Sequence, residues 1–215
     1  MRIRRTIAAM LAGGVLMGTM ALPVAAATPP SVADVLARDG VTFDSNPYDF
    51  DIVEKAALTV IGAKPGSTVA QLANPNASLT VFAPNDRAFQ VLVYSLTGRW
   101  YWSEAKVFEK LVAAVSGLVG PSKTIDTIEA ILLYHVVPGK VMSSAVPSLD
   151  GKDITTVGGE TFRVKVGYWF TRLIDKDPDA LNPTLIKSKL DIRAGNSVIH
   201  GISLVLRPLD LPRGY

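Results

Sequence analysis

The spacing of apolar residues changes from helical to strand-like along the chain. Before Pro138-Gly139, most apolar positions recur every three or four residues, which is typical of amphipathic helices packed on a core. After that point, apolar and polar residues alternate, which is typical of half-buried strands. Helices that gather early and strands that gather late predict an α+β domain rather than an alternating α/β one.

Capping and stop residues bound the predicted helices. Ser31, Ser103 and Thr124 suit helix N-caps, and Gly40 suits the end of the first helix. We expect helical segments at 31–40, 50–61, 68–72, 85–93, 103–117 and 124–132.

Short apolar runs predict the strands. A buried strand is expected at 79–82, where Ala83-Pro84 ends it and Asn85 caps the helix that follows. Gly158-Gly159 lies between two strand-like runs and predicts a tight hairpin. We expect the later strands at 154–157, 161–166, 185–192 and 197–206. The aromatic segment 168–170 either continues a strand or starts a loop.

The N-terminal segment has the features of a secretory signal peptide. Three arginines precede an apolar run at 7–22, and Pro23 and the small residues 24–27 follow. We predict cleavage after Ala27 or one residue earlier; the alternative is an uncleaved anchor helix, since the run approaches the ~20 residues that span a bilayer. The predicted organisation is a signal peptide at 1–27, a linker at 28–30, one domain at 31–208 and a tail at 209–215.

Charge and cysteine content exclude several classes of function. The signal segment holds three Arg and no acidic residue, so its removal reduces the 22 basic residues to 19, against 19 acidic ones. A neutral chain without a basic run lacks the electrostatic surface that nucleic acid requires, so we expect no nucleic-acid partner. The absence of Cys excludes disulfides and a cysteine-linked lipid anchor, and we expect no stable membrane anchor after cleavage.

Candidate catalytic and metal-binding groups are sparse. The two histidines, His135 and His200, lie in apolar runs and are expected to be hydrogen-bonded core residues. The sequence carries no nucleophile-elbow or phosphate-loop motif. The acidic segment 175–179 does not continue as an EF-hand, so we interpret it as a solvated turn, and we interpret Asp44, Asp49 and Asp51 in the same way. We therefore predict no metal, no cofactor and no enzyme activity.

An aromatic segment is the strongest surface candidate. Arg99, Trp100, Tyr101 and Trp102 follow one another between two predicted helices. Tyr and Trp are favoured at interfaces because they offer a large contact area with little loss of conformational entropy. The alternative is that these rings cover the helical layer.

Three segments together resemble the fasciclin domain family. They are LTVFAPNDRAF at 79–89, LLYHVVPG at 132–139 and NSVIHGISLVLRP at 196–208. The resemblance implies a wedge of two packed β-sheets covered by helices, with 79–89 next to 196–206. It also makes Tyr134 and His135 candidate partner-binding residues, because the matching segment is implicated in integrin binding among animal relatives.

The resemblance, together with the lack of catalytic and metal-binding motifs, predicts a binding role. We expect a secreted or cell-envelope adhesion module that binds a protein or glycan of the cell surface or matrix without catalysis. The alternative is a secreted carrier for a small apolar or polysaccharide ligand, which a deep apolar pocket would favour. An enzyme would need two or more titratable groups that converge in a cleft.

Overall fold

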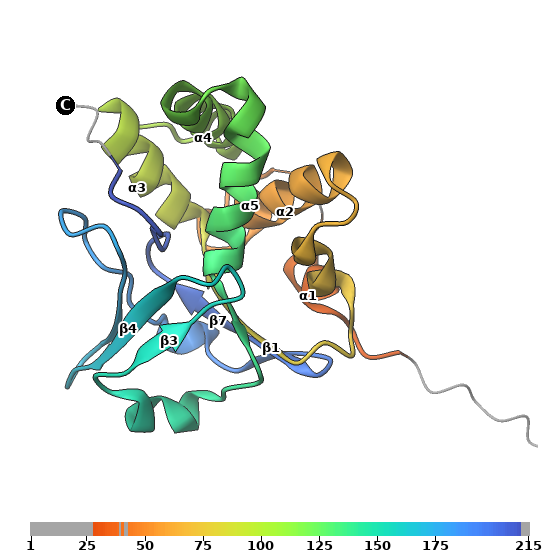
Figure 1. Cartoon of the computed structure of the whole chain (residues 1–215), viewed down its shortest axis with the longest axis vertical. Coiled ribbons are helices and arrows are strands. Elements are labelled where there is room, and N and C mark those ends of the chain that lie inside the picture. Colours follow the sequence, from red (N-terminus) through yellow and green to blue (C-terminus); the bar gives the residue numbers. More distant parts are fainter. Residues whose placement is uncertain (1–27, 39, 41–42, 212–215) are drawn as a thin grey trace, which may run out of the picture.

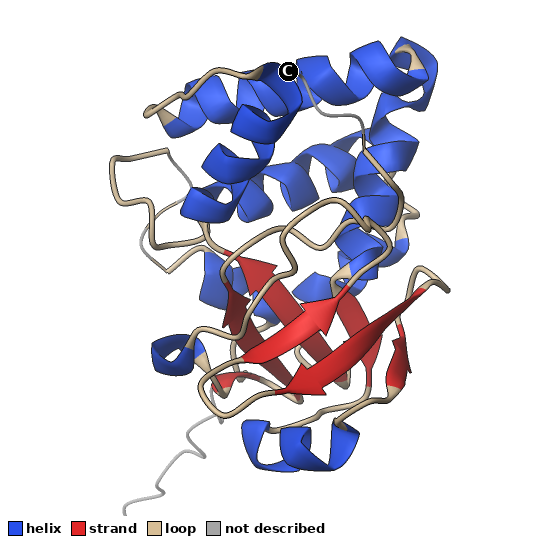
Figure 2. Cartoon of the chain, turned by 90° about the vertical axis from the view of Figure 1, so that its left-hand side faces the viewer, coloured by secondary structure: helices blue, strands red, loops and turns tan. Residues whose placement is uncertain are grey.

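The chain forms a wedge of two β-sheets capped by a layer of helices (Figures 1 and 2). The structure, a computed structural model, describes residues 28–38, 40 and 43–211; the predicted signal peptide lies outside them. One sheet has the strand order β2-β1-β7-β6 and the other β3-β4-β5. The strands are β1 (Leu79–Pro84), β2 (Val136–Pro138), β3 (Asp153–Thr155), β4 (Thr161–Val166), β5 (Thr171–Ile174), β6 (Ile192–Ala194) and β7 (Ser197–Ile202). The predicted α+β wedge is confirmed.

Strands β1 and β7 form the centre of the four-stranded sheet. They run parallel, with register from Thr80 opposite Val198 to Pro84 opposite Ile202. Strand β2 pairs antiparallel with β1, and β6 pairs antiparallel with β7. The first and third fasciclin-like segments therefore lie side by side, as the resemblance implies.

Alternating side chains of β1 divide the interior into two apolar clusters. Val81 and Ala83 pack with the helices, whereas Phe82 packs between the two sheets. The ring of Phe82 meets the ring of Phe162 in β4 edge to face, with 5.4 Å between centroids. This alternation follows from the two-residue period of a strand, because one face meets the helices and the other meets the second sheet.

The described part of the chain holds five α-helices, which form a layer next to the four-stranded sheet (Figure 2). They are α1 (Val32–Leu36), α2 (Asp51–Ala63), α3 (Asp86–Thr97), α4 (Glu104–Val119) and α5 (Thr124–Tyr134). Short 3₁₀ helices lie at η1 (Thr68–Ala73), η2 (Pro121–Lys123), η3 (Ser143–Leu149) and η4 (Lys187–Lys189).

Most of the predicted helix starts are confirmed. The side chains of Ser31, Asn85 and Ser103 each accept a hydrogen bond from the backbone of the first helical turn. Thr124 does not cap α5, because it is the first helical residue and its hydroxyl donates to the Gly120 carbonyl at 3.1 Å. The first helix ends at Leu36, before the predicted stop at Gly40.

Two predicted strands are shorter than their alternating patterns indicate. The segment 185–192 makes an isolated bridge at Leu185, turns through η4 and enters β6 only at Ile192. Asp191 has a positive φ of 55°, which breaks an extended strand. The last strand ends at Ile202 rather than Leu206. Beyond it, the Leu206 amide donates to a histidine ring instead of to a neighbouring strand.

Candidate functional site

Tyr134 and His135 are buried where α5 meets the two sheets. Only 1% of Tyr134 and 3% of His135 is exposed. The Tyr134 hydroxyl donates to the Thr161 carbonyl at 2.9 Å. His135 Nδ1 donates to the Ile131 carbonyl at 2.7 Å, and its Nε2 accepts the Leu206 amide at 2.8 Å. Both ring nitrogens are therefore used inside the fold.

The burial of His135 fixes its charge state. Removal from water lowers the pKa of the imidazole to about 4, although the bond to Ile131 acts in the opposite direction. The ring is neutral at pH 7 and ties α5 to the segment after β7. A partner that docks on the folded domain does not reach His135 or Tyr134, so their predicted role in direct binding finds no support in their position.

His200 has an equivalent structural role on β7. Its Nδ1 accepts the Asp191 amide at 3.2 Å, and its Nε2 donates to the Val141 carbonyl at 2.9 Å. The Asp191 carboxylate accepts hydrogen bonds from the amide and the hydroxyl of Ser143. Ser, Asp and His thus converge, but Ser143 bonds to the carboxylate and not to the ring. Because no hydrogen bond joins the Ser143 hydroxyl to the His200 ring, this arrangement does not activate a serine nucleophile. The prediction that both histidines are hydrogen-bonded core residues is confirmed.

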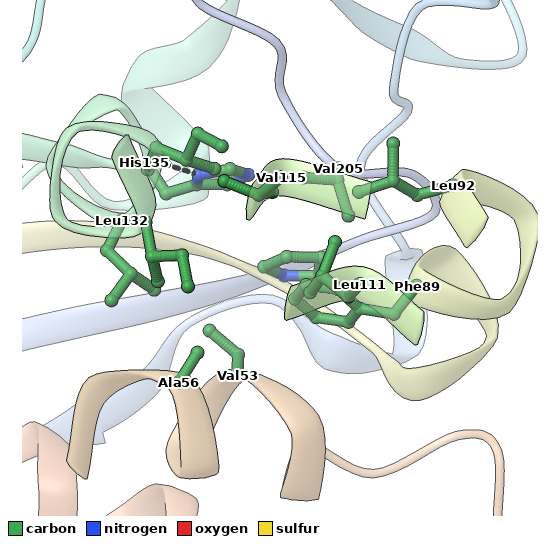
Figure 3. A pocket seen from close by; sticks show the side chains of 12 residues that line it. Val53, Ala56, Phe89, Leu92, Leu111, Val115, Leu132, His135 and Val205 are labelled. Atoms are coloured by element: carbon green, nitrogen blue, oxygen red, sulfur yellow. Dashed lines mark hydrogen bonds between the residues drawn. The ribbon is translucent and has the colours of Figure 1, made fainter. Parts of the chain in front are cut away.

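The apolar cavities are small. The cavity beside His135 has a volume of about 30 Å³ and is lined by apolar side chains such as Val53, Phe89 and Leu132 (Figure 3). A second cavity of about 140 Å³ lies between the sheets around Phe82. A third of about 240 Å³ lies among α3, α4 and α5. Pockets that enclose drug-sized ligands usually measure about 300–1,000 Å³.

The predicted aromatic segment forms a cluster of contacting rings beside α3. The Trp100 ring lies under the Arg87 guanidinium, 4.4 Å from its centre, and contacts the rings of Tyr94 and Trp102 at 5.9 and 5.8 Å. Trp102 is 76% exposed. We call Tyr94, Arg99, Trp100 and Trp102 the tryptophan surface.

The two interpretations of this segment each hold for some of its residues. Tyr101 packs against the apolar core and covers the helical layer, whereas Arg99 and Trp102 face solvent. The indole nitrogen of Trp100 is buried without an acceptor among the described residues. Their role in binding a partner stays a prediction.

A second aromatic surface forms the tip of the β4–β5 hairpin. Tyr168 is 90% exposed, and Trp169 and Phe170 are also exposed. The Gly167 amide donates to the Phe170 carbonyl at 2.9 Å, so the segment is a tight turn and not a continued strand. The sequence was compatible with a strand or a loop here, and no surface was expected. Three consecutive large aromatics cannot all face the same side of a strand, and this pattern could have indicated an exposed aromatic surface.

Acidic residues converge where the loop before α2 meets α3 and α4. Asp49, Asp51, Asp86 and Glu104 are buried, so the interpretation of Asp49 and Asp51 as solvated turn residues is wrong. One carboxylate oxygen from each of Asp44, Asp49 and Glu104 lies within 4.8 Å of the other two. Sequence reasoning missed this group because its members are up to 60 residues apart.

Burial raises the pKa of two carboxyl groups in this cluster. The pKa of Asp86 rises to about 9, chiefly through burial and then through the neighbouring Asp49 carboxyl. The pKa of Glu104 rises to about 7 through burial and through Asp49, Asp51 and Asp44. Asp86 accepts hydrogen bonds from the backbone amides of Asp51 and Ile52, so its carboxyl group caps the first turn of α2. The cluster thus brings several titratable groups together at one place.

The acidic turn after β5 is also more buried than predicted. Asp177 is buried and pairs with the Arg207 guanidinium at 3.0 Å. Asp175 accepts the Arg207 amide at 2.9 Å, and burial raises the pKa of its carboxyl to about 6. Arg207 also donates to Ser95 in α3 at 2.9 Å. The expectation of a solvated turn is wrong for Asp177, which anchors the C-terminal segment.

Among residues 28–38, 40 and 43–211, no helix has both the length and the apolar character that crossing a bilayer requires.

Comparisons with known proteins agree with this fold. The family model of the fasciclin domain matches residues 60–208. Protein sll1483 of Synechocystis sp. (strain ATCC 27184 / PCC 6803 / Kazusa) is 29% identical over 164 residues, which is 73% of each chain.

A solved structure of a FAS1 domain pair from the insect cell adhesion molecule fasciclin I has a similar fold, with a TM-score of 0.54 at 16% identity. The similarity covers 83% of this chain and 51% of the pair, so the chain spans about half of that structure. The match of the family model over most of the chain, together with the paired β1 and β7 strands, shows that the chain belongs to the fasciclin domain family.

Proposed function

We propose that this chain is a secreted or cell-envelope interaction module that binds a protein or glycan surface without catalysis. Membership of the fasciclin family supports this, because its domains are typically extracellular or surface-associated and generally not enzymes. The insect domain pair of similar fold comes from a cell adhesion molecule. The N-terminal segment, with its basic start and apolar run, supports export.

The tryptophan surface is the observation that carries this proposal. Trp102 presents most of its ring to solvent, while Trp100 beneath it is held by Arg87 and Tyr94. A ring held in place loses little conformational entropy on binding, and an aromatic face suits both sugar rings and apolar protein side chains. Arg99 beside it offers a charged hydrogen-bond donor.

The cavities favour this role over that of a carrier. The apolar cavities beside His135, between the sheets and among α3, α4 and α5 measure about 30, 140 and 240 Å³, below the about 300–1,000 Å³ of pockets that enclose drug-sized ligands. A larger apolar ligand would need the packed sheets or helices to separate.

A binding screen of the mature chain against glycan arrays and cell surfaces tests the proposal. We expect the Trp100→Ala/Trp102→Ala variant to lose binding by tenfold or more, because exposed tryptophans often dominate interface energies. The matched control is Tyr168→Ala/Trp169→Ala, which removes two exposed aromatics from the hairpin tip and should leave binding within about threefold. Trp102→Ala alone, at the more exposed ring, provides a variant with little effect on folding.

Two results would overturn the proposal. Binding that is unchanged in both tryptophan variants would remove the tryptophan surface as the site. A screen in which the folded chain binds no glycan and no cell surface would contradict the interaction role itself.

A further inference from the structure

The three carboxylates of Asp44, Asp49 and Glu104 have the spacing of ligands around one cation. Their nearest oxygens all lie within 4.8 Å of one another. Calcium–oxygen distances of about 2.3–2.6 Å place oxygens on opposite sides of one ion about 5 Å apart, so a single ion can contact all three. The ligands come from two elements, because Asp44 and Asp49 belong to the loop before α2 and Glu104 starts α4.

A buried, unpartnered oxygen lies in this group. Asp49 is only 6% exposed, and its Oδ1 has no hydrogen-bond donor among the described residues. The Asp49 carboxyl shares a hydrogen bond with the Asp86 carboxyl, but no N–H or hydroxyl of the described residues donates to its Oδ1. Buried carboxylate oxygens are normally paired, so this oxygen has room for a further partner. In the part of the chain that the structure describes, no Lys or Arg forms an ion pair with Asp44, Asp49 or Glu104.

The backbone already holds two of the ligands in place. The Asp44 amide donates to Glu104 Oε2 at 2.8 Å, which joins the loop to the first residue of α4. The Asp86 amide donates to the Asp49 carbonyl at 3.2 Å, which fixes the other end of the loop. Asp44 is exposed, so an ion can reach the group from solvent on this side.

We propose that Asp44, Asp49 and Glu104 bind a calcium ion that joins the loop 43–50 to the start of α4. Carboxylate oxygens are hard ligands that favour Ca²⁺ over softer metals, and water from the Asp44 side can complete a coordination number of six to eight. This site differs from the expectation that these residues are solvated, and it is independent of the tryptophan surface.

The electrostatics of the cluster agree with a cation site. Asp44 and Asp49 place two further carboxyl groups beside the buried Glu104. Negative charges this close repel one another, and a divalent cation would offset that repulsion. A proton shared among the acids is the competing way to reduce the charge, and the following measurement separates the two.

The test is thermal unfolding of the chelator-treated mature chain in CaCl₂ at constant ionic strength. We expect the Tm to rise by about 5–10 °C at a free Ca²⁺ concentration 100 times the Kd, and calorimetric titration to give one site. The Asp49→Asn/Glu104→Gln variant keeps the side-chain shapes but removes two charges, and its Tm should not respond to Ca²⁺. Asp210→Asn, at an exposed acid far along the chain, is the matched control and should respond like the unmodified chain.

Several outcomes would overturn the site. An unmodified chain whose Tm does not change with Ca²⁺ binds no ion there and shares a proton instead. An Asp49→Asn/Glu104→Gln variant that keeps the full Tm shift places the ion elsewhere. A larger shift in MgCl₂ than in CaCl₂ contradicts the choice of metal. Asp44→Asn changes only the exposed ligand, so it should weaken the response at least threefold even if the double variant folds poorly.

Discussion

A single ring, that of His135, connects two parts of the fold. It donates to a carbonyl in α5 and accepts the amide of Leu206, which lies after β7. An accepting nitrogen must be unprotonated, so protonation of the ring breaks the bond to Leu206 and leaves a buried charge. His135 is therefore a point where acid weakens the fold.

Acid should destabilise the domain through His135. An unfolded histidine titrates near pH 6.5, whereas folded His135 has a pKa of about 4. Between these values the unfolded chain binds more protons, so stability falls as the pH falls. From pH 7 to pH 5, this residue should lower the free energy of unfolding by about 2 kcal/mol.

The measurement is urea denaturation of the unmodified chain and of a His135→Gln variant at both pH values. Carboxyl groups with a raised pKa, such as Glu104, act in the opposite direction, so the comparison between the two chains isolates the histidine. Equal pH dependence in both would contradict the assignment.

At the residue scale, local chemistry was predictable and burial of charge was not. The caps Ser31, Asn85 and Ser103 follow from side chains that reach their own helix. The apolar neighbours of His135 predicted its burial. Asp49 and Glu104 are charged residues in segments without a clear apolar period, and the tertiary contact between the loop and α4 removes them from water.

At the element scale, α2 depends on another segment for its start. Phe50 is its N-cap and has no side chain that can bond to the first turn. The Asp86 carboxyl, from the first turn of α3, accepts the Asp51 and Ile52 amides at 3.2 and 2.8 Å. Two helices thus share one acidic residue, because Asp86 also lies at the N-terminal turn of α3.

Removal of the Asp86 side chain should destabilise the fold more than neutralisation does. In Asp86→Ala the two amides lose their acceptor inside the protein, at a cost of about 2–4 kcal/mol. Asp86→Asn keeps one acceptor oxygen, and burial already holds the pKa of Asp86 near 9, so its cost should stay near 1 kcal/mol. Chemical denaturation at pH 7 measures both, and equal losses would show that the carboxyl does not cap α2.

The predicted strands were right where the alternation of apolar and polar residues alone determines the structure. Strands β3 and β4 form the predicted hairpin, but β3 ends at Thr155 rather than Val157, so the connection is longer than the predicted two-residue turn at Gly158-Gly159. The segments 185–192 and 197–206 also alternate, but side-chain bonds interrupt them. The chain turns at Asp191, whose carboxylate accepts the Ser143 amide. The Ser203 hydroxyl accepts the Thr184 amide just after the end of β7. Those partners are distant in sequence, so periodicity alone does not reveal them.

At the scale of the whole molecule, the wedge depends on side chains packed between its two sheets. Phe82 on β1 contacts Phe162 edge to face and lies 5.8 Å from the His200 ring. It also lines the 140 Å³ cavity, so its removal would enlarge a space that already exists. This packing holds the three-stranded sheet against the four-stranded one.

Phe82→Ala should reduce the free energy of unfolding by about 3–5 kcal/mol, the usual cost of a large cavity in a core. The matched control is Phe170→Ala at the exposed hairpin tip, which should cost less than about 0.5 kcal/mol. Urea denaturation of both variants checks the difference. A small loss for Phe82→Ala would mean that the two sheets do not depend on each other.

The pairing of β1 with β7 also determines when the domain can become complete. These partners are separated by more than 110 residues, so the middle of the sheet forms only after most of the chain is available. Such distant pairing slows folding, because the entropy of closing a long loop is lost before the strand contacts stabilise the chain. During synthesis, β1 keeps a bare hydrogen-bonding edge until the last strand emerges, and a chain truncated before residue 197 would retain that edge as a site for aggregation.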